Sequence, residues 1–600
     1  MSIMDISKTT WNLAPLFSGD NDPEMEKNLS RIEESTSKFI SKWKDRDDYL
    51  IDPIILKEAL EEYQEWMNSC SYGERNFYYW WMKSRQDENS TEYKAKYNQI
   101  DEFAKKITTD IQFFPLKIAK IKDQQKMLEF EGLNEFKHFL ETIFIESKYL
   151  LSEPEEKIML MKSSVSYENW EKLTVSFLSK SEHEVLTEEN IREVKTFADI
   201  ISLCESSKKE VRDVASAAAN EILNNLSDIA EAEINSILAN KKIDDTLRGY
   251  DRADKSRHVS DDMDSDVVDK AVSTITNRFD IAKRYYNLKA SLFKQEKITY
   301  FERNVAFEEV EGDFSYQESV DLVYKVFQNL DDEFAQIFKS FVEEGHIDVF
   351  PRKGKDNGAW CQYISPSMPT YLMLNHADKL RDVLTIAHEA GHGINGEFMK
   401  KKQRALNYNT PTSTAEVAST FMEDFVLKEI LKTVTEEEKL NILLQKLNDE
   451  VSTIFRQIAF YNFETDLHKS FREKGYLSKQ EIGELFIKNI KAYLGDSVSF
   501  PEGAENWWIY VGHFRYFFYV YSYATGLLIS KSMQNNVKKD HAFIEKVKEF
   551  LIAGSSKSPK NIFSDMGIDI TDEKFWNAGL DEIDNLLNEV EALAKKLGKI

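Results

Sequence analysis

The stretch Thr385–Gly393 reads T-I-A-H-E-A-G-H-G and governs how the rest of the chain is interpreted. It places His388 and His392 four positions apart, with Glu389 directly after the first histidine. On a helix, residues four apart lie one turn apart on the same face, so both imidazoles can reach one metal ion. Glu389 would point at the water bound to that ion, which is the arrangement of a zinc hydrolase.

A helix around this stretch is predicted independently of the motif. Asn375 and Asp378 are candidate caps at its start. Apolar residues then recur at steps of three and four, as in an amphipathic helix, and they are Leu380, Val383, Leu384, Ala387 and Gly391. The alternative interpretation of the motif is two solvated histidines that flank a helical glutamate.

The composition is that of a large, folded, mainly helical protein. Its 600 residues exceed one ordinary domain, and 42% hydrophobic and 30% charged residues are values of globular proteins. Only 11 prolines and 21 glycines interrupt the chain, which favours helices because sheets need frequent turns. Clear helical patterns lie at 24–44, 54–66, 92–114 and 208–226.

Net charge and cysteine content limit which partners the protein is expected to bind and in which cellular compartment it is expected to lie. A formal charge of -26 repels phosphate backbones and anionic membrane surfaces, so we expect neither nucleic acid nor a membrane as a partner. Met1–Trp11 lacks the basic start and apolar run of a signal peptide. Cys70, Cys204 and Cys361 are too few and too dispersed for a disulfide framework. We therefore expect a cytoplasmic protein.

Two domains are expected, a helical one at residues 1–185 and one at residues 186–600 that carries the metal site. The boundary is placed between Ser181 and Thr187, where polar residues gather. Its position follows from composition alone, because no flexible linker is recognisable there.

A small sheet is expected just before the metal helix. Glycines and prolines interrupt the helical pattern between about 347 and 375, and the segments 359–364 and 370–374 predict short strands. Such a strand could hydrogen-bond an extended peptide along its backbone. A structural hairpin without a ligand is the alternative.

Zinc needs a third protein ligand besides the two histidines. The metzincin pattern is excluded, because it requires glycine at 395 and histidine at 398, where the chain has Asn395 and Phe398. A glutamate from a following helix is the other common ligand, and Glu416 stands in T-S-T-A-E-V-A-S-T-F-M-E. Ser413 and Glu416 also match a capping box, in which Glu416 would serve only its own helix.

Two further residues of this helix could hold a ligating histidine in place. Glu423 follows Glu416 on nearly the same helical face, and Thr420 lies one turn after Glu416. Either could be the hydrogen-bond partner of a metal-bound imidazole, and a solvated or core polar residue is the equal alternative.

Four motifs stand out together: H-E-A-G-H at 388–392, T-A-E-V-A-S-T-F-x-E at 414–423, G-A-W at 358–360 and H-F-x-Y-F-F-Y-V-Y-x-Y-A-T-G at 513–526. Together they resemble the oligoendopeptidase F branch of the thimet-oligopeptidase family. The resemblance covers about residues 257–580, and a W-x-L-x-x-L-F opening extends it loosely to the amino-terminal third. It implies a mainly α, large two-lobed metallopeptidase with a deep substrate channel and a small β-sheet beside the zinc helix.

The resemblance also implies roles for the motif residues. One zinc ion per chain would be bound by His388, His392 and Glu416, and Glu389 would be the catalytic base. We expect the substrate to contact Gly358, Ala359, Trp360 and Tyr519.

A histidine and tyrosines of the late aromatic motif would assist catalysis. His513, Tyr516 and Tyr523 match best, since 516 and 523 lie on one face if this segment is helical. Tyr519 and Tyr521 are competitors for this role. Core packing is the alternative for the whole aromatic run.

The expected activity is hydrolysis of internal bonds of short peptides by a zinc-activated water. Glu389 would take a proton from the water and deliver it to the departing amine. A dipeptidyl carboxypeptidase with the same metal set and a catalytically silent peptide-binding scaffold are the rival functions. Beyond short peptide substrates we expect no partner, and the chain is expected to be a monomer or weak oligomer.

Overall fold

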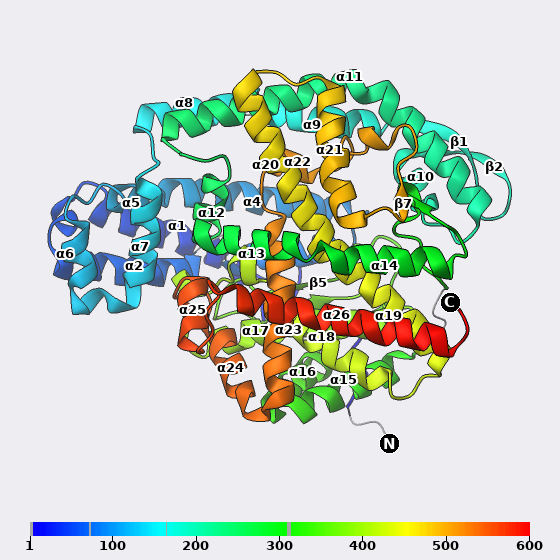
Figure 1. Ribbon diagram of the computed structural model, residues 1–600. Helices are drawn as coiled ribbons and strands as arrows, with labels where there is room; N and C mark the ends of the chain where they lie inside the picture. The colour runs from blue at the N-terminus through cyan, green and yellow to red at the C-terminus, as the bar shows by residue number, and fades with distance from the viewer. Residues whose placement is uncertain (1–3, 71–73, 164, 309–313) are drawn as a thin grey trace. The chain divides into compact units, whose positions relative to one another are not determined.

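The computed structural model describes residues 4–70, 74–163, 165–308 and 314–600, and most of them lie in helices (Figure 1). The predicted mainly α class is therefore confirmed. The chain forms two compact units, each built from three separate stretches. Unit 1 contains Met1–Lys148, Glu311–Thr433 and Met533–Ile568, and unit 2 contains Tyr149–Val310, Val434–Ser532 and Asp569–Ile600.

These units divide the chain differently from the predicted domains 1–185 and 186–600. The predicted boundary lies inside unit 2, where strand β1 (Glu182–Leu186) pairs with β2 (Arg192–Thr196) in an antiparallel hairpin. The polar residues gathered there belong to this hairpin, whose side chains are mostly exposed. A division of the chain by function stays a prediction, as does the deep channel.

Unit 1 carries the H-E-A-G-H motif. Its helices are α1 (Glu24–Trp43), α2 (Pro53–Cys70), α3 (Glu74–Gln86), α4 (Thr91–Ile111), α5 (Phe113–Ile118), α6 (Gln124–Glu129), α7 (Lys137–Ser147), α15 (Tyr316–Leu330), α16 (Asp332–Glu344), α17 (Leu380–Lys400), α18 (Val417–Ile430), α24 (Ile544–Ala553) and α25 (Pro559–Asp565). The helices predicted at 24–44 and 54–66 are confirmed as α1 and α2. The pattern at 92–114 is divided between α4 and α5.

A three-stranded sheet of unit 1 lies against α17. Strand β4 (Ile347–Asp348) pairs in parallel with β6 (Tyr371–Met373), which pairs antiparallel with β5 (Trp360–Gln362). Helix α17 packs on both β5 and β6. The predicted sheet beside the metal helix is confirmed, although its strands are shorter than predicted and β4 is an additional strand.

The amino-terminal opening supports this sheet. Trp11 is 7% exposed, and its Nε1 donates a hydrogen bond to the Leu372 carbonyl at 2.8 Å. The Tyr371 hydroxyl donates to the carbonyl of Asn12 at 2.8 Å. The ring of Trp11 also lies 5.4 Å from that of Trp360 in β5. The W-x-L-x-x-L-F opening therefore packs into the same unit as the metal helix.

Unit 2 contains α11 (Lys209–Arg248), a helix of 40 residues, which is far longer than the predicted 208–226. It ends at Gly249, whose φ of 75° continues the chain in the left-handed region.

The other elements of unit 2 are α8 (Glu153–Ser163), α9 (Tyr167–Leu178), α10 (Phe197–Leu203), α12 (Lys255–Ser260), α13 (Ser265–Asn277), α14 (Phe279–Leu292), α19 (Glu436–Val451), α20 (Gln457–Lys474), α21 (Lys479–Leu494), α22 (His513–Tyr516) and α26 (Glu573–Lys596), with β3 (Ile298–Thr299) parallel to β7 (Val498–Ser499). Helix α23 (Tyr521–Lys539) has residues in both units.

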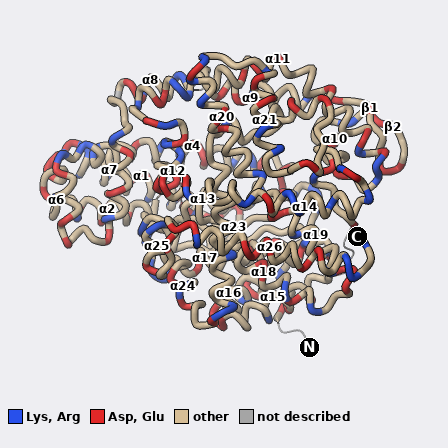
Figure 2. Tube along the Cα trace, in the orientation of Figure 1, with Lys and Arg blue, Asp and Glu red and all other residues tan. Residues whose placement is uncertain are grey.

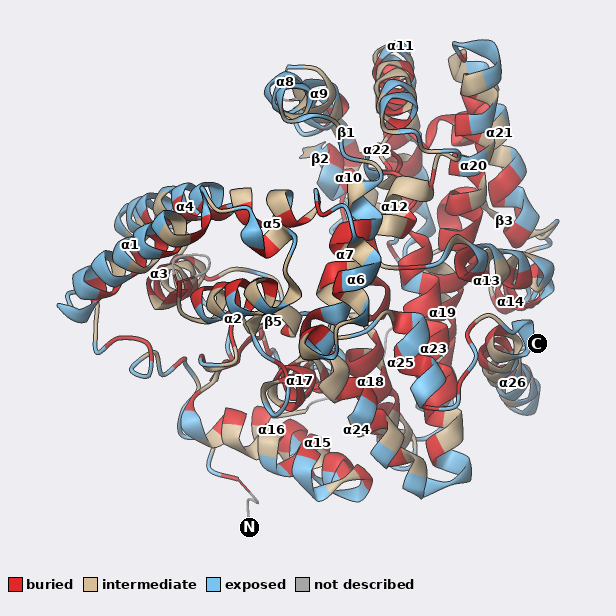
Figure 3. Ribbon diagram, turned by 90° about the vertical axis from the view of Figure 1, so that its left-hand side faces the viewer, coloured by how far each residue is buried: buried red, intermediate tan, exposed pale blue. Residues whose placement is uncertain are grey.

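Charged residues are spread over the helices of both units, whereas burial is concentrated in particular helices. Acidic and basic residues are interspersed along the helices of both units (Figure 2), whereas α17 and α18 are largely buried (Figure 3). Across the ranges that the structure describes, no helix is both long and apolar enough to cross a membrane. The three cysteines are free thiols.

Candidate metal centre

Helix α17 presents the motif, and its start is fixed by a carboxylate that the sequence did not single out. Asp382 accepts the backbone N–H of Lys379 at 3.0 Å, so the predicted caps Asn375 and Asp378 do not serve this end. Asn375 instead donates its side-chain amide to the carbonyl of Gly358 at 2.8 Å. It thereby fixes the loop that leads into β5.

The three predicted metal ligands lie together. Nε2 of His388 lies 3.3 Å, and Nε2 of His392 3.4 Å, from the same carboxylate oxygen of Glu416. Ligand atoms bound about 2.0–2.1 Å from a tetrahedral zinc ion are about 3.3 Å apart, so a single ion fits these spacings. In the described part of the chain, these residues form the group of acids and histidines close enough to share an ion.

Glu416 does not act as a capping-box residue. Helix α18 begins at Val417, and Glu416 occupies the N-cap position without a side-chain hydrogen bond to the helix backbone. Its carboxylate faces the two imidazoles and accepts the hydroxyl of Ser419 at 3.0 Å. The hydroxyl of Ser413 is buried and has no hydrogen-bond partner among the residues that the structure describes. The capping alternative is therefore wrong, and the helix starts later than the sequence pattern predicted.

Of the two candidate partners for a ligating imidazole, Glu423 is the one in contact. Nδ1 of His388 lies 3.2 Å from a Glu423 carboxylate oxygen. The hydroxyl of Thr420 donates instead to the backbone carbonyl of Glu416 at 2.7 Å. With Nδ1 directed at a carboxylate, Nε2 of His388 is the nitrogen left to bind a metal.

Gly391 permits the close approach of α17 and α18. A Cβ atom at this position would lie 2.7 Å from Cα of Ser419 and 2.8 Å from the carbonyl oxygen of Ala418. The backbone of α18 therefore passes directly over the motif, and Glu416 at its start can reach both histidines. A glycine inside a strong helical pattern is the one sequence signal for this contact.

The histidine and glutamate side chains of the site shift one another's pKa values. Burial lowers the pKa of His388, but hydrogen bonds to Glu416 and Glu423 outweigh it and raise that pKa to about 10. Burial raises the pKa of Glu416, and its contacts with both imidazoles outweigh burial and hold that pKa well below its usual value. Glu389 is 6% exposed, and burial raises its pKa despite the adjacent histidines. A raised pKa suits a carboxylate that has to take up a proton near neutral pH.

The predicted substrate-binding segment occupies the sheet edge. The strand order β4-β6-β5 leaves one side of β5 without a neighbouring strand. The Trp360 side chain is used for packing, since its ring lies 4.7 Å from that of Trp81 in α3. The Tyr78 hydroxyl donates to the Gln362 carbonyl at 2.7 Å. Tyr78 and Trp81, which sequence patterns did not identify as functional, thus support this edge.

The late aromatic residues lie in unit 2 and do not share one helix. His513 and Tyr516 are in α22, Tyr523 is in α23, and Phe517 and Phe518 between them have φ values of 54° and 58°. These positive φ values interrupt the helical backbone between α22 and α23. The assumption that 516 and 523 share a helical face is therefore wrong.

The structure groups His513, Tyr519 and Tyr523, places Tyr516 at the edge of this group with its ring centroid 6.5 Å from that of Tyr519, and separates Tyr521. Nδ1 of His513 is hydrogen-bonded to the Tyr519 hydroxyl, and both rings lie beside Tyr523, with centroids 6.0 and 5.9 Å away. Tyr516 is 49% exposed and donates its hydroxyl to Glu171 of α9. Tyr521 is fully buried and donates to Asp261 at 2.8 Å, which is a core position.

Comparison with known proteins assigns the family. Residues 171–582, more than half of the chain, match the model of Peptidase family M3. The chain belongs to peptidase family M3. Residues 120–180 match the model named Oligopeptidase F. This chain is accordingly a metallopeptidase, as the sequence motifs predicted.

Relatives and solved structures extend over nearly the whole chain. Oligopeptidase PepF of Bacillus subtilis is 25% identical and covers 98% of this chain and 88% of its own length. An oligoendopeptidase F homolog of Borreliella burgdorferi is 26% identical and covers 98% of both chains. The crystal structure of oligoendopeptidase-F from Enterococcus faecium superposes with a TM-score of 0.70 at 18% identity, over 96% of this chain and 99% of that one. At this identity the structural likeness concerns the fold.

Replacing Gly391 by alanine should weaken metal binding. The added methyl group would force α18 away from α17, at a cost of about 1–3 kcal/mol of stability. Chelator competition would measure metal affinity and urea unfolding would measure stability. Gly19→Ala is the matched control, because nothing lies within 4 Å of its Cβ position. Wild-type metal affinity in Gly391→Ala would contradict the role of this contact.

Glu423→Ala should lower metal affinity about 10- to 100-fold, because His388 would lose the carboxylate that orients its ring. Thr420→Ala should change metal affinity less than about threefold, since its hydroxyl contacts only backbone. Competition with a fluorescent chelator would measure both affinities. Equal losses in the two variants would show that the Glu423 contact has no special role.

Proposed function

We propose that this chain is a zinc endopeptidase that cleaves internal bonds of short peptides. The main support is the convergence of His388, His392 and Glu416 on one point, with 3.3 and 3.4 Å between nitrogen and oxygen. Two nitrogens and one carboxylate oxygen are the donor set of catalytic zinc. Relatives whose names include oligopeptidase and oligoendopeptidase F support short peptides as substrates.

In this proposal His388, His392 and Glu416 hold one zinc ion per chain. When bound there, zinc supplies a Lewis acid that polarises the scissile carbonyl and makes the attacking water more acidic. Glu389 takes the proton from that water and delivers it to the leaving amine. Burial of Glu389 supports this role because it makes the carboxylate a better proton acceptor.

The other predicted site residues act on the peptide. The backbone of Gly358, Ala359 and Trp360 leads into the free edge of β5, where an extended substrate can add as a strand. By the resemblance, one or two donors among His513, Tyr516 and Tyr523 hydrogen-bond the developing oxyanion, each worth about 3–4 kcal/mol. Tyr519 is proposed to contact substrate, and its hydrogen bond to His513 supports a place beside that group.

The remaining expectations belong to the same proposal. Short peptides are the proposed partners, with neither nucleic acid nor a membrane among them, in keeping with a net charge of -26. A monomer or weak oligomer in the cytoplasm is proposed, and the free thiols suit a reducing compartment.

Glu389→Gln should keep zinc and lose turnover, with kcat lower by about 100- to 10,000-fold because the base is gone. His392→Ala should lose both zinc and activity. Atomic absorption on the purified protein and cleavage of a quenched peptide would measure the two properties. Near-normal rates in Glu389→Gln would exclude the proposed base.

Digestion of a mixed peptide library, read by mass spectrometry with and without a chelator, tests the whole proposal. Cleavage within short peptides that stops on chelation is the expected result. Peptides with blocked carboxyl ends separate the rival activities, since an endopeptidase cuts them and a dipeptidyl carboxypeptidase does not. Absence of chelator-sensitive cleavage would leave only the silent peptide-binding scaffold.

A further inference from the structure

The turn between α22 and α23 has backbone angles that phenylalanine rarely adopts. Phe517 and Phe518 both lie in the left-handed region, with φ values of 54° and 58°. Bulky side chains adopt this region only when surrounding structure holds them there. His513 and Tyr516 precede the turn, and Tyr519 and the start of α23 follow it, so its geometry sets their relative positions.

Glu464 of α20 holds the turn from one side. Its carboxylate accepts the backbone N–H of Phe518 at 2.9 Å. The side chain is fully buried, and its second oxygen has no hydrogen-bond partner among the described residues. Burial raises the pKa of Glu464 to about 8. A half-satisfied carboxyl group in a core lowers stability relative to an apolar side chain, so packing alone does not explain this residue.

Arg257 of α12 holds the same turn from the other side. Its Nη2 donates to the carbonyl of Tyr516 at 3.0 Å, and its Nε donates to the carbonyl of Phe517 at 3.3 Å. The two anchors therefore bind the same peptide group between Phe517 and Phe518, Glu464 at its N–H and Arg257 at its carbonyl oxygen, and Arg257 also binds the preceding carbonyl.

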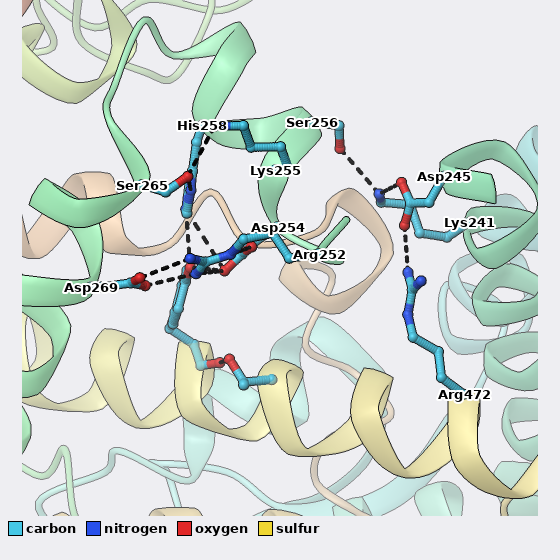
Figure 4. A network of polar contacts seen from close by, with 12 residues as sticks. Lys241, Asp245, Arg252, Asp254, Lys255, Ser256, His258, Ser265, Asp269 and Arg472 are labelled. Carbon is cyan, nitrogen blue, oxygen red and sulfur yellow. Dashed lines mark hydrogen bonds and ion pairs between the residues drawn. The ribbon is translucent and has the colours of Figure 1, made fainter. Parts of the chain in front are cut away.

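The helix that carries Arg257 is itself fixed by a partly buried polar network (Figure 4). Arg252 bridges Asp254 and Asp269 with contacts of 2.6 to 2.8 Å. His258 lies 3.0 Å from the Ser265 hydroxyl, and the Tyr461 hydroxyl of α20 donates to Asp254 at 2.6 Å. Helices α12, α13 and α20 thus form one rigid base for the turn.

Ring packing completes this base. The imidazole of His468 lies 5.1 Å from the ring of Phe517 and 4.8 Å from that of Phe518. The ring of Tyr461 lies 5.4 Å from Phe518. Both phenylalanines are buried, so the strained conformation is held by contacts on every side that the structure describes.

We propose that Glu464 and Arg257 are positioning residues that hold the Phe517-Phe518 turn and thereby set the places of His513, Tyr519 and Tyr523 for catalysis. This inference rests on the proposed role of the late aromatic motif in peptide hydrolysis. Glu464 acts through the backbone of the turn. Arg257 binds the same backbone, and its guanidinium also lies 5.7 Å from the centre of the Tyr519 ring.

Substitution of Glu464 tests the proposal, because it separates positioning from stability. Glu464→Gln keeps an oxygen that can accept the Phe518 N–H, so its kcat should stay within about threefold of wild type. Glu464→Leu removes the acceptor, and its kcat should fall about 10- to 100-fold while KM and zinc content stay near wild type. Its melting temperature should be unchanged or higher, since a half-satisfied buried carboxyl group is gone.

Control experiments distinguish failure of the positioning role of Glu464 from failure of the proposed endopeptidase function. Glu473→Leu, an exposed glutamate on the same helix, should leave kcat unchanged. In a His513→Ala/Tyr519→Phe/Tyr523→Phe background, Glu464→Leu should add little further loss, because the groups it positions are already removed. Wild-type kcat in Glu464→Leu, or a loss that only accompanies a lower melting temperature, would overturn the proposal. Absent chelator-sensitive cleavage by the wild-type protein would instead overturn the endopeptidase function.

Discussion

The backbone contact between α17 and α18 at Gly391 is the constraint on which the metal centre depends. The two histidines come from one helix, but Glu416 and Glu423 come from the next, and only close approach of the two backbones brings these carboxylates within 3.2 to 3.4 Å of imidazole nitrogens. A side chain at 391 would occupy the space that α18 backbone fills. Because Gly391 has no Cβ, Glu416 can reach Nε2 of His388 and Glu423 can reach its Nδ1.

The sheet beside this centre depends on parts of the chain that are remote in sequence. Strands of two or three residues are too short to be stable alone. Trp11 and Tyr78 supply the missing hydrogen bonds and apolar cover, and they come from the opening of the chain and from α3. This explains why the first 148 residues share a compact unit with the metal helix. A boundary read from polar composition could not reveal this, because the contacts that define the unit are long-range.

Sequence reasoning succeeded where a local pattern and the tertiary structure agree. The periodicity of α1, α2 and α17 and the short strands beside α17 follow from local patterns along the chain. Spacing along α18 offered Glu423 and Thr420 equally as partners of a ligating imidazole, and the structure shows that Glu423 is the one in contact. Sequence reasoning failed where tertiary contacts outweigh a local signal. The capping-box spacing of Ser413 and Glu416 is such a signal, since it offered an alternative to the predicted metal-ligand role of Glu416, whose carboxylate faces the histidines. The late aromatic run has an apolar pattern that suits a helix, yet Glu464 and Arg257 hold it in a turn.

A sequence pattern could not predict the turn at Phe517 and Phe518, because the backbone there opposes the local preference of these residues. Among the described non-glycine residues with positive φ, Asn190, Asp262 and Asp378 have short polar side chains that tolerate this region, and Glu74 and Lys294 are single long polar residues. Phe517 and Phe518 do not have polar side chains, and each left-handed residue of this kind costs about 1–3 kcal/mol. No helical pattern in the sequence encodes such a cost, because it is offset by a carboxylate and a guanidinium far away along the chain. Strain that opposes local preference, held by a buried carboxyl group that itself lowers stability, is expected where geometry is retained for function and not for folding.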